Sequence, residues 1–136
     1  MRIEKIQHTN RLLAMIMYAG NLQDGITFHT SDENSLQVGE HSYLKGKVIA
    51  PHSHQPVKVD RFETMQEVLV IKKGKVKVLL YTEEGESIGE KILQSGDMIL
   101  LIAGGHGFEM LEDAQFIEIK QGPYLPESRK RLEIKE

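Results

Sequence analysis

Short apolar segments alternate with polar turns along most of this chain. Segments rich in Val, Ile, Leu and Tyr are separated by clusters of Gly, Asp, Asn and Ser at intervals of about ten residues, which is typical of an all-β sandwich or barrel. Long helical periodicity is absent from the sequence. The pattern predicts strands at 12–19, 25–30, 36–43, 46–54, 66–73, 75–82, 87–93, 97–103, 106–112 and 115–121.

Gly74 separates two of these strands and predicts a hairpin turn between them. After the glycine, Val76, Val78 and Leu80 alternate with polar residues, so we expect these three side chains to face the core. Further turns are expected at 83–87 and 94–97.

The size and composition are those of one ordinary globular domain. With 136 residues, 40% apolar and 27% charged, the chain predicts one domain over 1–125, and the strand spacing favours a β-sandwich or β-barrel with accessory strands at its N-terminal end. A charged C-terminal tail is expected over 126–136. A net charge of −3 and the lack of a basic stripe argue against a nucleic-acid partner.

The absence of cysteine removes disulfides and thiolate ligands, and it is compatible with a cytoplasmic protein. Apolar runs at 12–19 and 98–103 are much shorter than the roughly 20 residues that span a bilayer, so no membrane partner is expected. We expect a cytoplasmic location. Imidazole and carboxylate groups remain as the strong metal ligands.

His52 and His54 occupy positions i and i+2 of the strand predicted at 46–54. Both imidazoles would therefore project from one face, which also carries Val48 and Ala50 and would point into a core. Burying two imidazoles is costly unless each ring has a partner, and a shared metal ion supplies one.

A carboxylate and a third histidine show the same placement. Glu67 shares parity with Leu69 and Ile71, and His106 shares parity with Phe108, so both polar groups are expected among inward apolar neighbours. A buried carboxylate beside a cation becomes a charged ligand, which offsets its desolvation.

His52, His54, Glu67 and His106 are therefore the predicted ligands of one divalent metal ion. The ligand types suit Fe, Mn, Ni, Cu or Zn and do not choose among them. Twelve residues separate His54 from Glu67, and in that interval Glu63 and Gln66 are alternative ligands.

The spacing of these residues resembles the first signature motif of the cupin superfamily. The motif runs from Gly46 through the HxH pair and continues from Glu67, which six residues separate from Gly74. The segment 96–106 resembles the second cupin motif. The resemblance implies a jelly roll, or double-stranded β-helix barrel, with the metal inside one mouth and a homodimer as the assembly.

The segments 104–111 and 116–124 resemble a narrower group of small cupins associated with surface-polysaccharide loci. The leading hypothesis is a metal-dependent enzyme acting on a small polar molecule, such as a sugar or sugar nucleotide. The alternatives are a non-enzymatic module that binds a small ligand or is stabilised by its metal, and a metal-free sugar isomerase or epimerase. Parity alone leaves open whether Tyr81, Glu118 and Lys120 point into the mouth or outward.

Overall fold

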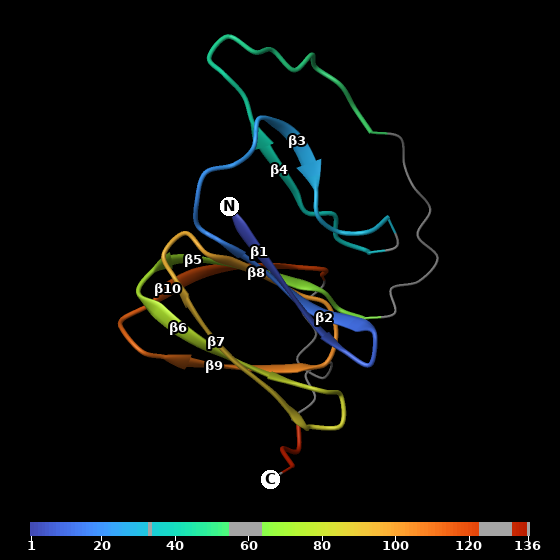
Figure 1. The fold of residues 1–136 in the computed structure, drawn as a ribbon, viewed down its shortest axis with the longest axis vertical. Coiled ribbons are helices and arrows are strands. Elements are labelled where there is room, and N and C mark those ends of the chain that lie inside the picture. The colour runs from blue at the N-terminus through green and yellow to red at the C-terminus, as the bar shows by residue number, and fades with distance from the viewer. Residues whose placement is uncertain (33, 55–63, 123–131, 136) are drawn as a thin grey trace. The chain divides into compact units, whose positions relative to one another are not determined.

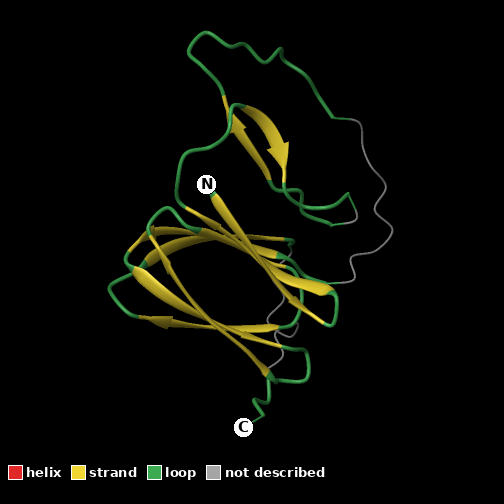
Figure 2. Ribbon diagram, in the orientation of Figure 1, coloured by secondary structure: helices red, strands yellow, loops and turns green. Residues whose placement is uncertain are grey.

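The structure is a computed structural model that describes residues 1–32, 34–54, 64–122 and 132–135. These residues form antiparallel strands joined by turns and loops, with no helix among them (Figure 2). The strands are β1 (Arg2–His8), β2 (Arg11–Tyr18), β3 (Gly25–Phe28), β4 (Gly39–Ser42), β5 (Glu67–Lys73), β6 (Lys75–Tyr81), β7 (Ser87–Gln94), β8 (Met98–Leu101), β9 (Gly105–Met110) and β10 (Gln115–Lys120). The described part of the chain contains no helix long and apolar enough to cross a membrane.

The chain divides into two compact units, which we describe separately. The first unit, called the sandwich unit, comprises Met1–Gly20 and Thr64–Glu136. The second, called the insert unit, is Asn21–Glu63 and contains the two-stranded sheet β3–β4.

Two antiparallel sheets make up the sandwich unit. One has the strand order β1-β2-β8-β5-β10, and the other has the order β7-β6-β9 (Figure 1). Their apolar faces meet in one core, as in a β-sandwich. The prediction of an all-β protein built from antiparallel sheets is confirmed.

The predicted hairpin at Gly74 is wrong, because β5 and β6 belong to different sheets. Gly74 has a φ of 79° and is the single residue between the two strands, so it forms a corner at which the chain passes from one sheet to the other. The local alternation of apolar residues was nevertheless predicted correctly. Val76 and Val78 are fully buried, and Leu80 is nearly so.

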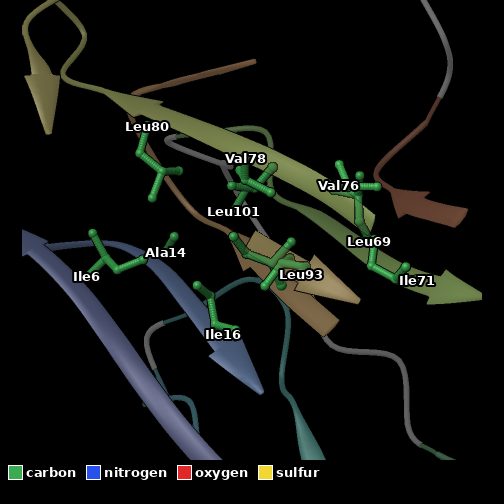
Figure 3. Packing of buried hydrophobic residues seen from close by; sticks show 11 residues of the cluster. Ile6, Ala14, Ile16, Leu69, Ile71, Val76, Val78, Leu80, Leu93 and Leu101 are labelled. Carbon is green, nitrogen blue, oxygen red and sulfur yellow. The ribbon is translucent and has the colours of Figure 1, made fainter. Parts of the chain in front are cut away.

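The core lies between the two sheets. Figure 3 shows the apolar side chains of β6 and of β2 directed into the same interior. Leu69 and Ile71 of β5 also belong to this cluster and are almost completely buried, as the sequence predicted. Phe108 of β9 packs against its edge.

At the β1 and β7 edges, a polar cluster links the two sheets. Glu4 of β1 accepts a hydrogen bond from the Tyr18 hydroxyl at 2.7 Å, and its other carboxylate oxygen lies 2.6 Å from Lys91 Nζ on β7. The Arg2 guanidinium lies over the Tyr18 ring, 3.6 Å from its centroid. The hydrogen bond from Lys91 is the main reason why the pKa of Glu4 is lowered.

The strand predicted at 46–54 is also wrong. Residues 46–54 form a turn and irregular chain, with Val48 78% exposed. Gly46 adopts a φ of 95° and Pro51 has no N–H to donate, so both positions are poorly suited to a β ladder. Conversely, β1 was not predicted, because its charged residues hide the strand pattern.

The described part of the C-terminal tail lies against the turn between β6 and β7. The Lys135 backbone N–H donates to the Gly85 carbonyl at 3.1 Å, in the turn between β6 and β7. The rest of the predicted tail, 126–131 and 136, lies outside the described residues.

Candidate functional site

Glu67 and His106 meet across the two sheets of the sandwich unit. Glu67 is the first residue of β5, where its parity with Leu69 turns it inward, and His106 lies on β9 opposite Leu80 of β6. His106 Nε2 is 3.3 Å from Glu67 Oε2, and the Glu67 side chain is 18% exposed. Two of the predicted ligands are therefore in direct contact, at the end of the core.

Lys120 and Glu118 of β10 complete this polar group. The β5–β10 register places Lys120 directly opposite Glu67 and places Glu118 opposite Leu69, so both side chains share the inward face. Lys120 Nζ lies 3.7 Å from Glu67 Oε1 and donates to Glu118 Oε1 at 3.1 Å. The question that sequence parity left open for these two residues is thus settled by the strand register.

The pKa of Glu67 is held below its ordinary value. The hydrogen bond with His106 is the largest cause, and the charges of His106 and Lys120 act in the same direction, while burial opposes them. Glu67 is therefore a carboxylate at neutral pH, which is the form that ligates metal ions.

Aromatic rings line the group on one side. The His106 and Phe108 ring centroids are 5.3 Å apart, and those of Phe108 and Phe116 are 5.9 Å apart. Phe116 lies on β10 opposite Ile71 and shares the inward parity of Lys120. The site thus combines ionised groups with an apolar wall, as ligand sites commonly do.

His52 and His54 lie in the insert unit, and their rings are adjacent. The ring centroids are 5.1 Å apart at an interplanar angle of 70°, and His52 Nδ1 is 2.9 Å from the Ala50 carbonyl oxygen. Both residues are exposed and lie on irregular chain. The expectation of an inward pair on one strand face is therefore wrong, although the two imidazoles do lie side by side.

Of the two alternative ligands, Glu63 and Gln66, only Gln66 is among the described residues. Glu63 lies outside the described residues. Gln66 is 5% exposed, and its backbone N–H donates to the Gln121 side-chain oxygen at 2.8 Å, which ties the start of β5 to the end of β10.

The spacing of Glu67 and His106 suits two ligands of one ion. With ligand distances of about 2.1 Å, adjacent donors lie roughly 3.0 Å apart in octahedral geometry and roughly 3.4 Å apart in tetrahedral geometry. The observed separation is 3.3 Å. Within the described residues, however, no group of three or more His, Cys, Asp or Glu side chains is arranged to hold a metal ion.

A second histidine–carboxylate contact lies within the insert unit and was not predicted from the sequence. His29 Nε2 is 3.3 Å from Glu40 Oε2, and both side chains are largely buried. The register pairs Thr27 with Glu40, and the His29 N–H donates to the Val38 carbonyl, so the contact lies at the end of the β3–β4 ladder. Neither residue belongs to the predicted ligands.

Comparison of the chain with protein-family models, with curated proteins and with solved structures finds no match in any of the three.

Proposed function

We propose that this protein is a cupin-like metalloprotein in which His52, His54, Glu67 and His106 bind one divalent ion, and that it acts on a small polar substrate. The observation that carries the proposal is the contact between Glu67 and His106, which joins a carboxylate and an imidazole at a separation suited to a shared ion. The adjacent rings of His52 and His54 provide two more ligands of the same class.

The bound ion would act as a Lewis acid toward a substrate oxygen. The chain supplies the other requirements of such chemistry. Glu67 and His106 would hold the cation, and the rings of Phe108 and Phe116 would lie along one side of it. Glu67 is a ligand in this proposal, so it does not act as the general base.

Metal analysis of the purified protein tests the proposal. We expect one divalent ion per chain, lost in the double variant His52→Ala with His54→Ala and also lost in Glu67→Gln. His8→Ala is the matched control, since it removes an exposed histidine on β1 that is outside the ligand set. Unchanged metal content in the double variant contradicts the proposal.

The same measurement distinguishes one shared site from two separate sites. If the histidine pair and the Glu67–His106 pair held different ions, the wild type would bind two ions and each variant would lose one. A single ion that depends on both pairs supports the four-ligand site.

A second candidate function is a metal-free sugar isomerase or epimerase, and the same contact favours it. A carboxylate that orients an imidazole is a common arrangement for a general base, and Lys120 would stabilise an oxyanion nearby. Chelation discriminates between the two functions. Catalysed exchange of a sugar C–H for solvent deuterium that survives metal removal and is lost in His106→Gln supports the metal-free enzyme.

A non-enzymatic role predicts a different result. If the ion only stabilises the fold, chelation lowers the melting temperature and no small polar ligand raises it.

A further inference from the structure

The segment 43–49, which we call the insert loop, follows β4 in the insert unit as irregular chain (Figure 1). The Lys47 backbone N–H donates to the Leu44 carbonyl at 3.2 Å, and Gly46 has a φ of 95°, so these residues form a tight turn that requires glycine at its third position. Nothing lies within 4 Å of the place where a Cβ on Gly46 would stand. The tip of the turn is therefore surrounded by solvent.

Large aliphatic side chains of the insert loop are turned to solvent. Leu44 is 82% exposed, Val48 is 78% exposed and Ile49 is 55% exposed. Single exposed apolar residues are common on protein surfaces and need no explanation. Three of them around one turn concentrate apolar surface at one place, which is typical of a surface that binds a partner.

The charge of the insert loop is positive. Lys45 and Lys47 are exposed on either side of the glycine in the turn, and within the described residues neither lysine forms an ion pair. The segment 41–54 contains no Asp or Glu, although the chain has 20 acidic residues against 17 basic ones. Asp24 precedes the strand partner of Ser42, so it lies at the base of the loop. Charge complementarity therefore calls for an anionic partner.

The residue types of the loop favour a lipid surface over a protein partner. Protein interfaces are depleted in lysine, and leucine and valine are under-represented among the residues that dominate their binding energy. Segments that bind membrane surfaces instead combine lysine with large apolar side chains. Tyr43, exposed at the start of the loop, has an apolar ring and a polar end, which suits the headgroup region of a bilayer.

We propose that the insert loop binds the surface of an anionic lipid bilayer. Leu44 and Val48 enter the boundary of the acyl region, and Lys45 and Lys47 contact lipid phosphate groups. The expectation of no membrane partner depends on apolar runs too short to cross a bilayer, and a loop at the surface needs no such run. The lipid surface is independent of the proposed metal ligands.

Co-sedimentation of the full chain with lipid vesicles tests the inference. The probe is vesicles of phosphatidylglycerol and phosphatidylcholine in equal parts, and vesicles of phosphatidylcholine alone are the comparison without net charge. A chelator is present throughout, so that no metal ion bridges the histidines and the lipid. We expect binding to the anionic vesicles, weaker binding to phosphatidylcholine, and a loss of binding as the salt concentration rises, because salt screens exposed charges.

A double variant measures the contribution of charge. In Lys45→Gln with Lys47→Gln, the partition coefficient on anionic vesicles should fall about 30-fold, because each lysine near an anionic surface contributes roughly fivefold. Lys72→Gln with Lys73→Gln is the matched control, since these two lysines are also adjacent and exposed but lie at the end of β5 in the sandwich unit. The control should bind like the wild type.

A single variant measures the contribution of apolar insertion. Leu44→Ser should lower the partition coefficient about tenfold or more, because a large side chain no longer leaves water. Ile92→Ser is the control, since Ile92 is 54% exposed and lies on β7. Circular dichroism verifies that each variant is folded, and the salt dependence of the wild type tests the inference without any substitution.

Several results would overturn the inference. These are the absence of binding to anionic vesicles, equal binding to both kinds of vesicle, and binding that survives both loop variants or is lost in the β5 control. A dimer in vesicle-free solution that dissociates in Leu44→Ser, without vesicle binding by the wild type, would show that the loop contacts a second copy instead. Metal content enters none of these results, so failure of the proposed function is distinguishable from failure of this inference.

Discussion

Replacing Gly74 by alanine tests the corner at which the chain passes from one sheet to the other. Gly74 has a φ of 79°, and a Cβ added there would lie 2.3 Å from the backbone oxygen of Asp113. Asp113 is in the turn between β9 and β10, so the corner and that turn are packed backbone against backbone. The clash cannot be relieved by moving a flexible side chain.

The expected loss of stability has two parts. A left-handed conformation costs a non-glycine residue about 1–2 kcal/mol. Overpacking against the Asp113 backbone costs about 1–3 kcal/mol more. The sum of about 2–5 kcal/mol is a large share of the stability of an ordinary domain, which is about 5–15 kcal/mol.

Urea unfolding followed by circular dichroism measures this loss. With an m-value of about 2 kcal/mol/M, the midpoint of Gly74→Ala should fall by roughly 1–2.5 M. Gly107→Ala is the control, because a Cβ at this strand glycine makes only ordinary contacts, the nearest at 3.7 Å. Its midpoint should change little.

Gly74→Asn separates the two parts of the cost. Asparagine tolerates positive φ but still carries a Cβ, so we expect it to keep the overpacking cost of about 1–3 kcal/mol and to lose most of the conformational cost. A midpoint close to that of the wild type would refute the predicted clash with the Asp113 backbone.

Three further outcomes are expected. Leu69→Ala should lower the free energy of unfolding by about 2–5 kcal/mol, because it removes buried apolar surface and leaves a cavity. Ile117→Ala is the control and should cost much less, since that residue is 52% exposed. Equal losses for the two variants in urea unfolding would contradict the assignment of Leu69 to the core. The pKa of Glu4 is lowered, mainly by its hydrogen bond with Lys91, so its stabilising effect is present above the unfolded value of 4.5 and is lost as the pH falls through the lower folded value. Glu4→Gln should therefore flatten the decline in stability on acidification, and an unchanged pH profile would show that the contact with Lys91 is unimportant. Asp97→Ala should cost about 2–3 kcal/mol, because the buried carboxylate accepts two backbone N–H groups, and thermal melting indistinguishable from wild type would count against that role.

Much of the fold was predictable because strand periodicity is a local property. The alternation in β5 and β6 identified their buried residues, including Leu69 and Val78, although the hairpin between them was wrong. A single glycine between two strands has the same sequence pattern whether it forms a turn within one sheet or a corner between two. Only the partners of β5 and β6, which are distant in sequence, distinguish these cases.

Two strand predictions failed for opposite reasons, one at 46–54 and one at β1. The segment containing His52 alternates like a strand but is irregular, since alternation describes a face and does not supply a pairing partner. Strand β1 lacks the pattern because Glu4 interrupts it, yet Glu4 faces Lys91 of β7 and forms an ion pair there. Glu4 lacks the run of apolar neighbours of the same parity that marks Glu67 as inward, so its direction was predictable only from its partner on β7.

The candidate site was predicted in part for the same reason. Glu67 and His106 were recognised through their own apolar neighbours, and they are in contact. Lys120 and Glu118 were left open, because their direction depends on the register between β5 and β10.

That register is set by one irregular residue. Gln115 pairs with Lys73, but Phe116 pairs with Ile71, so Lys72 is an extra residue in β5. Without this offset, the ladder would place Ile119 opposite Leu69 and Lys120 opposite Val68. The inward face of β10 would then carry Ile117 and Ile119 and would lose Phe116, Glu118 and Lys120. Loss or gain of a single residue near position 72 can therefore replace a charged inward face of β10 by an apolar one, so the polarity of this face depends on strand length as well as on the side chains themselves.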